Sequence, residues 1–141
     1  MMGEVATIER PMKAPLRAGG NVLAGDDNSY YAYKRSKFLR RFLDTIDFQS
    51  KAIMEVGFGP GGNLRHIATR HRPHLILGAD ISQTMYDIAQ RNLRSFGNVK
   101  LAKIDGTHLP FDSRSVDLSF TVTVLQHVTN ASMLMSLVKD I

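Results

Sequence analysis

The sequence predicts an α/β fold in which a parallel sheet is flanked by helices, and three observations support this prediction. Short apolar runs of strand length alternate with longer segments whose apolar residues recur every three or four positions. A glycine-rich turn follows the first of these runs, and acidic residues stand at the ends of three of them. Strands that alternate with helices form a parallel sheet with right-handed crossovers, so their carboxyl ends meet at one end of the sheet.

Residues 1–29 show no sustained apolar period and are punctuated by proline, glycine, asparagine and aspartate. We expect them to form a flexible N-terminal arm. The predicted domain covers residues 30–141 and opens on a segment where apolar residues such as Phe38 and Phe42 recur with basic residues between them. This pattern predicts an amphipathic helix that ends near Leu43 and covers the sheet with these apolar residues.

Four strands are expected, and the first is a continuously apolar run, as in a parallel strand that is buried on both faces. Pro73 ends the helix after it, and Ser82 is a good N-cap for the next helix. Gly97 and Asn98 are expected to close that second helix. The predicted strands cover about residues 51–56, 74–79, 99–104 and 116–122, and a further helical segment is expected from Leu125.

Composition limits the class of protein. The 141 residues are enough for one domain with a core, and 43% hydrophobic and 22% charged residues are ordinary values for a soluble globular protein. The chain has no cysteine, which excludes disulfides and thiolate metal sites. No apolar run approaches the length of a membrane span, so we expect a cytoplasmic protein without a membrane partner.

The formal net charge of +5 comes largely from basic residues that cluster at residues 34–41 and 65–72. Solvated helix faces explain such clusters, and a patch for RNA or for an acidic substrate is the alternative. Few aromatic residues stand among the basic ones. Nucleic acid is therefore not favoured as the partner.

The glycine turn is central to the functional prediction. Gly57, Gly59 and Gly62 fit the spacing G-x-G-x-x-G, and Gly57, Gly59 and Gly61 fit G-x-G-x-G equally well. Glycine suits a turn between a strand and a helix because its backbone can take positive φ and a ligand can approach it closely. A structural turn without a ligand gives the same pattern. No Gly-Lys-Ser or Gly-Lys-Thr follows, which argues against a P-loop.

Three acidic residues stand at the ends of predicted strands, where ligands bind in such sheets. Glu55 precedes Gly57 by two positions, where nicotinamide-binding strands usually have an apolar residue or glycine. Asp80 follows Gly57 by 23 residues, a spacing at which a carboxylate can accept hydrogen bonds from ribose hydroxyls. Asp105 follows Asp80 by 25 residues and could accept a hydrogen bond from the exocyclic amine of adenine. Taken alone, Asp80 could equally be a helix cap and Asp105 a turn residue.

The segment Glu55-Val56-Gly57-Phe58-Gly59-Pro60-Gly61 resembles the first motif of class I S-adenosylmethionine-dependent methyltransferases. Later segments resemble further motifs of this family, in order and with matching spacing: residues 77–82 with Met85, the acidic-small-x-x-Leu-Pro-Phe segment at residues 105–111, and residues 116–128. The Leu-Pro-Phe segment separates this family from dehydrogenases. The resemblance covers about residues 50–130 and implies a Rossmann-like fold with S-adenosyl-L-methionine as cofactor.

The resemblance also implies roles for single residues. Glu55 helps to place the amino end of the methionine tail, Asp80 holds the ribose and Asp105 holds the adenine. The predicted cofactor-binding residues are Glu55, Gly57, Phe58, Gly59, Gly61, Asp80, Ile81, Met85, Asp105, Gly106 and Thr121.

Methyl transfer asks the protein for little proton chemistry, and a base is needed only where the acceptor is protonated. His127 and His108 are the candidates for that base, by position alone. His66, His71 and His74 show no metal-ligand spacing, so the sequence predicts no metal site.

The sheet of this family usually has seven strands and this chain supplies about four, so we expect the C-terminal part of the domain to be missing. In the family's strand order the fourth strand lies at an open edge, which favours self-association. The predicted function is methyl transfer to a small-molecule acceptor. The alternatives are a nicotinamide-dinucleotide-binding Rossmann domain and a catalytically inactive cofactor-binding module.

Overall fold

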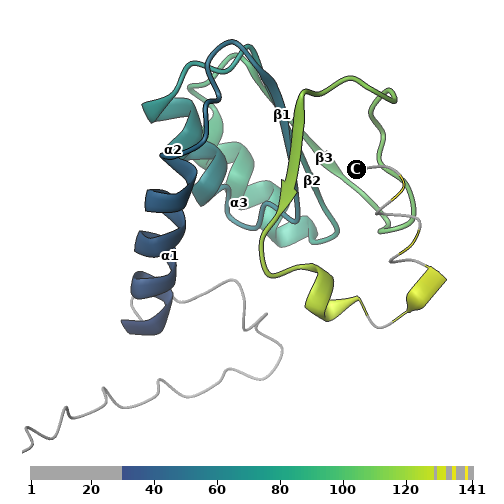
Figure 1. Ribbon diagram of the computed structural model, residues 1–141. Coiled ribbons are helices and arrows are strands. Elements are labelled where there is room, and N and C mark those ends of the chain that lie inside the picture. Colours follow the sequence, from purple (N-terminus) through teal and green to yellow (C-terminus); the bar gives the residue numbers. More distant parts are fainter. Residues whose placement is uncertain (1–29, 129, 133–134, 136–138, 140–141) are drawn as a thin grey trace, which may run out of the picture.

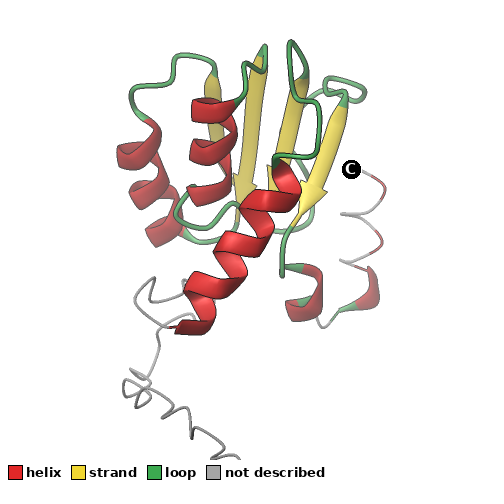
Figure 2. Cartoon of the chain, turned by 60° about the vertical axis from the view of Figure 1, so that its left-hand side comes forward, coloured by secondary structure: helices red, strands yellow, loops and turns green. Residues whose placement is uncertain are grey.

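The computed structural model describes residues 30–128, 130–132, 135 and 139, and it gives the backbone alone for residues 30–35 and 126. The predicted flexible arm, residues 1–29, therefore lies outside the described residues. A parallel sheet forms the centre of the described part, and helices cover one of its faces (Figure 1, Figure 2). This arrangement confirms the predicted α/β, Rossmann-like fold.

The elements follow the predicted order, and the strand bounds agree with expectation to within two residues. The segment expected to be helical from Leu125 begins as a short 3-10 helix, and its later residues lie partly outside the described ones. Within the described ranges, no helix combines the length and the apolar character that a membrane crossing requires. The elements are α1 (Tyr30–Leu43), β1 (Ala52–Val56), α2 (Gly62–Arg70), β2 (Leu75–Asp80), α3 (Gln83–Leu93), β3 (Val99–Lys103), β4 (Leu118–Thr121) and η1 (Leu125–His127).

All four strands are parallel and follow the order β3-β2-β1-β4. β1 and β2 occupy the centre, with a neighbouring strand on both sides, whereas β3 and β4 are the outer strands of the described sheet. Every residue of β1 and β2 after the first is buried, while the outer strands contain no fully buried residue. β4 lies at the margin of the described sheet, the place that the family's strand order predicts for it.

Two apolar clusters hold the sheet, one on each face. The smaller contains Met54, Val56 and Leu77, and the loop residues Leu109 and Phe111 pack against it, so the Leu-Pro-Phe segment covers this face. The larger lies between the sheet and the helices. Its buried members are Leu43, Phe48, Ile53, Phe58, Leu64, Ile67, Ile76, Ala89 and Leu93.

The face that α1 turns to the core differs from the predicted one. Leu43 is buried and Leu39 packs against the same cluster, whereas Phe38 is 74% exposed and Phe42 is 55% exposed. The predicted covering face with Phe38 and Phe42 is therefore wrong. Leu39 and Leu43 are four residues apart on the helix, so they share one face, and that face contacts the core instead.

α3 begins as predicted and ends earlier. The Ser82 hydroxyl accepts a hydrogen bond from the Met85 N–H at 3.3 Å, which confirms the predicted N-cap. The helix ends at Leu93, so the predicted closure by Gly97 and Asn98 is wrong. The turn after the helix packs its aromatic residue against the larger cluster, and the chain leaves the helical path before it reaches Gly97.

Candidate functional site

The turn between β1 and α2 uses glycine at three positions for different reasons. Gly57, Gly59 and Gly61 have φ of +78°, +54° and +82°, in the left-handed region that side-chain-bearing residues rarely adopt. A Cβ at Gly57 would overlap the Val124 side chain, and one at Gly61 would lie 2.8 Å from Leu93 Cδ1. No described atom lies within 4 Å of a Cβ built at Gly59. A ligand can therefore approach the turn at Gly59.

Glu55 is an acid in the interior of the protein, at the end of β1, and only 1% of it is exposed. The Asn63 side-chain amide donates a hydrogen bond to Glu55 Oε1 at 2.7 Å, while Oε2 is buried and has no partner among the described residues. Burial raises the pKa of Glu55 to about 8; the Asn63 hydrogen bond opposes this rise and the nearby Asp80 charge adds to it. The described part of the chain therefore offers no donor to Oε2, and a cationic group is the partner that would best stabilise the ionised form.

Asp80, at the end of β2, connects the glycine turn to the start of α3. Its side chain is largely buried, and its Oδ2 accepts a hydrogen bond from the Gly59 N–H at 2.8 Å. Its Oδ1 accepts one from the Ser82 N–H, also at 2.8 Å. Each carboxylate oxygen can accept a second hydrogen bond. Asp80 thus orders the turn and keeps acceptor capacity for a ligand.

Asp105 follows β3 and is exposed. Its Oδ1 accepts hydrogen bonds from the Thr107 N–H at 2.8 Å and from the Thr107 hydroxyl at 2.7 Å. The backbone hydrogen bond from Thr107 is the main cause that holds the pKa of Asp105 below its ordinary value. These contacts are those of a turn residue, with the neighbouring Gly106 at φ of +91°. The structure therefore gives Asp105 a local role that does not depend on a ligand.

The other predicted cofactor residues lie in varied surroundings. Phe58 is buried in the larger cluster and lies against Gly78, so it can present only its backbone to a ligand. Ile81 is 61% exposed directly after Asp80, and Met85 is half-buried in the first turn of α3. Thr121 ends β4 opposite Val56, and its buried Oγ1 has no hydrogen-bond partner among the described residues.

The two histidines predicted as candidate bases are both exposed. His108 Nδ1 lies 2.8 Å from the Thr107 hydroxyl, and His127 ends the 3-10 helix η1. Neither belongs to the buried group of acids at the ends of β1 and β2. Their assignment as bases stays a prediction.

Sequence reasoning missed two residues at the turn. Asn63 holds the buried carboxylate, and the signal that could have found it is an amide side chain one residue into the helix that follows the glycines. Val124 packs on Gly57 from the segment after β4. That contact joins parts of the chain far apart in sequence, so no local pattern predicts it.

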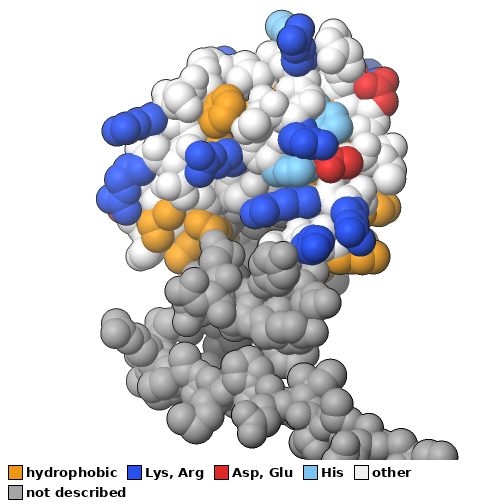
Figure 3. Space-filling model, turned by 90° about the vertical axis from the view of Figure 1, so that its left-hand side faces the viewer, with side chains coloured by type: hydrophobic (Ala, Val, Ile, Leu, Met, Phe, Trp, Pro, Cys, Tyr) orange, Lys and Arg blue, Asp and Glu red, His pale blue; other side chains and the backbone are white. Residues whose placement is uncertain are grey.

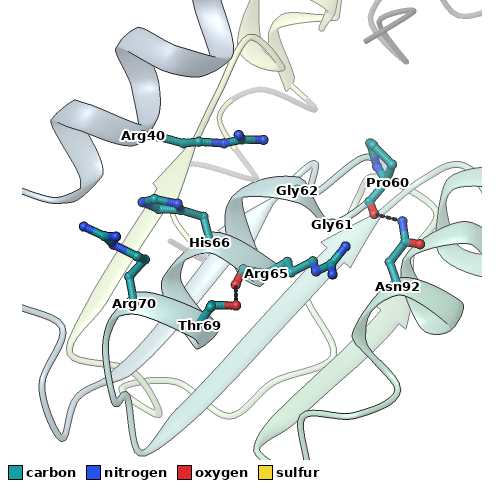
Figure 4. A pocket seen from close by; sticks show the side chains of 9 residues that line it. All are labelled: Arg40, Pro60, Gly61, Gly62, Arg65, His66, Thr69, Arg70 and Asn92. Atoms are coloured by element: carbon teal, nitrogen blue, oxygen red, sulfur yellow. Dashed lines mark hydrogen bonds between the residues drawn. The ribbon is translucent and has the colours of Figure 1, made fainter. Parts of the chain in front are cut away.

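A cavity of about 370 Å³ lies beside the glycine turn, on the helical side of the molecule. Figure 4 shows the Arg40 side chain extending from α1 across this space and the Arg65 side chain extending from α2 toward Asn92. Figure 3 shows Lys and Arg side chains gathered on the same helical face, with histidine among them. The residues that line the cavity are Arg40, Pro60, Gly61, Gly62, Arg65, His66, Thr69, Arg70 and Asn92. Since only Gly61 of the predicted cofactor residues lines it, this cavity is separate from the predicted cofactor site.

Known proteins resemble this chain in sequence. A family model described as a methyltransferase domain matches residues 53–140. A tRNA (guanine-N(7)-)-methyltransferase of Thermotoga maritima is 32% identical over 80 residues, which cover 53% of this chain and 26% of the relative. A malonyl-[acyl-carrier protein] O-methyltransferase of a Marinomonas species is 28% identical over 97 residues, which cover 68% of this chain and 36% of the relative. The chain thus spans about a quarter to just over a third of these curated relatives.

Solved structures resemble the fold at low identity. An S-adenosylmethionine-dependent methyltransferase from Mesorhizobium loti aligns with a TM-score of 0.60 and 22% identity, over 74% of this chain and 48% of that one. Phosphoethanolamine N-methyltransferase 1 of Haemonchus contortus, solved with phosphoethanolamine and S-adenosylhomocysteine, aligns with a TM-score of 0.55 and 23% identity. That alignment covers 64% of this chain and 19% of the other. At these identities the likeness is one of fold.

Proposed function

This chain belongs to the methyltransferase domain family, and from that premise we propose that it is the cofactor-binding part of an enzyme that methylates a small-molecule acceptor. S-adenosyl-L-methionine is the cofactor of this family. A cytoplasmic location stays a prediction from the sequence.

The observation that carries the proposal is an oxygen of Glu55 that has no hydrogen-bond partner among the described residues. Oε2 is buried at the end of β1, directly before the turn whose Gly59 is open to a ligand. A buried carboxylate oxygen without a donor is costly, so a ligand with a cationic donor gains by binding there. The α-ammonium of the methionine tail is such a group. We assign Glu55 to the amino end of the cofactor, with the glycine turn beside it.

The remaining acids fit the other end of the same ligand. Asp80 keeps acceptor capacity after its two backbone hydrogen bonds, and we assign it to the ribose hydroxyls. Asp105 and Gly106 are assigned to the edge of the adenine ring. Ile81 and Met85 stand after Asp80 and offer apolar surface to the ring.

The protein's contribution to methyl transfer is mainly position. When bound, the cofactor supplies a methyl group that is already activated by the sulfonium charge. The residues named above hold and orient the cofactor, and alignment with the acceptor supplies much of the rate. His108 and His127 are the proposed sources of a base for a protonated acceptor.

A small-molecule acceptor is supported by the Haemonchus contortus neighbour, whose structure contains phosphoethanolamine. The Thermotoga maritima relative is named for a tRNA substrate, so an RNA acceptor is the alternative to test. The nicotinamide alternative is disfavoured because Glu55 places a buried acid beside the glycine turn.

Isothermal titration calorimetry with S-adenosylhomocysteine tests the proposal. The wild-type chain is expected to bind it, while NADH at the same concentration gives no heat. Glu55→Gln should raise the Kd roughly 10–150-fold, as expected for loss of a hydrogen bond between charged groups. Asp112→Asn, which changes an exposed loop acid, is the control and should leave Kd unchanged.

The pH dependence of the same titration gives a second readout. Because the pKa of Glu55 is about 8 without ligand, binding a cation below that pH must displace its proton. Wild-type affinity should rise from pH 6 to pH 8, by at most about tenfold per pH unit, and Glu55→Gln should remove most of this rise. Tight NADH binding would contradict the assignment, and so would a Kd for S-adenosylhomocysteine that Glu55→Gln leaves unchanged.

A further inference from the structure

A second group of polar side chains lies where the turn after α1 meets α2. His66 Nε2 lies 2.7 Å from Asp44 Oδ1, and His71 Nε2 lies 3.3 Å from the same oxygen. One donor atom from each of the three side chains lies within 4.8 Å of the other two. Two imidazole nitrogens therefore lie beside one carboxylate oxygen.

The end of α2 explains why spacing along the sequence predicted no such site. Two residues five apart on a continuous helix point in different directions. The helix stops at Arg70, and His71 takes an extended backbone with φ of −116° and ψ of 173°. The buried Phe48 ring then packs edge-on against the His71 ring, with centroids 5.2 Å apart. These constraints bring His71 to the same side as His66.

We propose that Asp44, His66 and His71 bind a divalent transition-metal ion of the zinc class. Neutral imidazole nitrogens with one carboxylate oxygen are a ligand set that zinc prefers, at bond lengths of about 2.0–2.2 Å. In a tetrahedral site such bonds place ligand atoms about 3.3 Å apart, so the separations of 2.7 Å and 3.3 Å need only a small opening. Three protein ligands leave the fourth position to water.

Partial burial favours this use of the cluster. The side chains of His66 and His71 are 14% and 18% exposed, and that of Asp44 is 33% exposed. The two rings are thus held in place, while the carboxylate faces solvent and can adjust. Ligands whose orientation is fixed in advance lose little freedom on binding.

The surrounding charge works against a cation and gives the sharpest test. Arg70 Nη2 lies 3.9 Å from Asp44 Oδ2, and Arg40 extends over the adjoining cavity. Repulsion between these guanidinium groups and the ion should weaken binding. Arg70→Gln removes one repulsive charge, so it should bind zinc more tightly than wild type. If the three side chains only hydrogen-bond to one another, Arg70→Gln should not raise the affinity for zinc. If the cavity binds an anion, the same change should weaken that binding.

The site would connect two elements that define the helical face. Asp44 follows α1 directly, while His66 lies within α2 and His71 at its end. A metal bound at this junction stabilises the folded state by an amount set by its concentration relative to Kd. Zinc should therefore raise the melting temperature of the chain, independently of cofactor or turnover.

The test uses the untagged full chain after removal of metal with a chelator. Titration with Zn²⁺ alone is expected to show one site, and Co²⁺ should give the visible absorption of a tetrahedral complex. His66→Ala and His71→Ala should each weaken binding about 100-fold or more, since each removes a ligand. His74→Ala, which changes an exposed histidine outside the cluster, is the matched control and should bind as wild type does.

Equilibrium dialysis that finds no zinc bound to the wild-type chain at 100-fold molar excess overturns the proposal. An equal loss of zinc affinity in His74→Ala and His66→Ala also overturns it. So does an Arg70→Gln variant that binds neither Zn²⁺ nor Co²⁺ more tightly than wild type. Far-UV circular dichroism of each variant establishes folding. If His66→Ala fails to fold, Asp44→Asn and Arg70→Gln, both changes at exposed side chains, keep the test decisive.

Discussion

Acidic residues lie near the ends of both inner strands and of the outer strand β3, and their surroundings differ. Glu55 and Asp80 end the inner strands β1 and β2, are buried, and contact Asn63 or the backbone of the glycine turn. Asp105 follows the outer strand β3, is exposed, and accepts hydrogen bonds from Thr107 in its own turn. Position in the sheet thus decides whether a carboxylate is buried beside the glycine turn or exposed at the surface.

The difference teaches how effects of substitution should scale. A hydrogen bond in the interior leaves a costly unpaired group when one partner is removed, whereas water replaces a lost partner at the surface. Changes at the ends of β1 and β2 should therefore affect both stability and binding. Changes after β3 should affect binding alone, and only if the residue contacts the ligand.

The largest expected effect on binding and stability together is that of Asp80→Ala. It removes the acceptor of the Gly59 and Ser82 N–H groups together with the proposed ribose contact. We expect Kd for S-adenosylhomocysteine to rise about 100-fold and the free energy of unfolding to fall by roughly 1.5–3 kcal/mol. Calorimetry and urea denaturation measure the two quantities.

Asp105→Ala is the matched control for that experiment. Because the Asp105 carboxylate is exposed, its removal should leave the urea midpoint unchanged. The rise in Kd should be smaller than that caused by Asp80→Ala. Equal losses of stability in both variants would contradict the distinction between inner and outer strands.

The next effect concerns Glu55 and the stability of the chain without ligand. The folded-state pKa of about 8 lies above the ordinary value of 4.5, so the folded state holds a proton that the unfolded state loses. The contribution of Glu55 to the free energy of unfolding should be greatest below about pH 4.5 and fall as pH rises toward 8, by at most about 1.4 kcal/mol per pH unit. Urea denaturation at pH 5, 6.5 and 8 measures this slope. Glu55→Gln should flatten it, and an unchanged slope in that variant would assign the dependence to another group.

Two glycines in one turn should respond differently to the same change. Gly57→Ala brings a Cβ into the Val124 side chain at positive φ, so the free energy of unfolding should fall by roughly 2–5 kcal/mol. Gly59→Ala meets no described atom and should cost only the backbone strain of about 1–2 kcal/mol. The Kd for the cofactor should rise more in Gly59→Ala than in Gly57→Ala, because the proposed ligand approaches Gly59. A Gly59→Ala variant that binds S-adenosylhomocysteine like wild type would remove this turn from the site.

The smallest effect is expected at the outer strand β4, which pairs with β1 on one side in the described sheet. An unpaired parallel strand edge favours pairing with another chain, so we expect weak, concentration-dependent self-association. Light scattering across a dilution series measures it. A strict monomer at all concentrations, with robust methyl transfer to a panel of acceptors, would show that this edge needs no partner.

The sequence by itself determined the alternation of strands and helices, the N-cap at Ser82 and the position of the glycine turn. These features depend on periodicity and backbone freedom, which are local properties of a few neighbouring residues. The same local pattern placed Glu55, Asp80 and Asp105 at strand ends, as the structure confirms. It did not distinguish a buried acid from an exposed one.

Only the tertiary structure decided which groups meet. It turned the leucines of α1 to the core in place of Phe38 and Phe42, because the docking of the helix selects one face among several apolar ones. It buried Glu55 beside Asn63, and it brought Asp44 to His66 across 22 residues of sequence. Burial and long-range contact depend on how all the elements pack together, and that packing sets the pKa of an acid and the grouping of ligands.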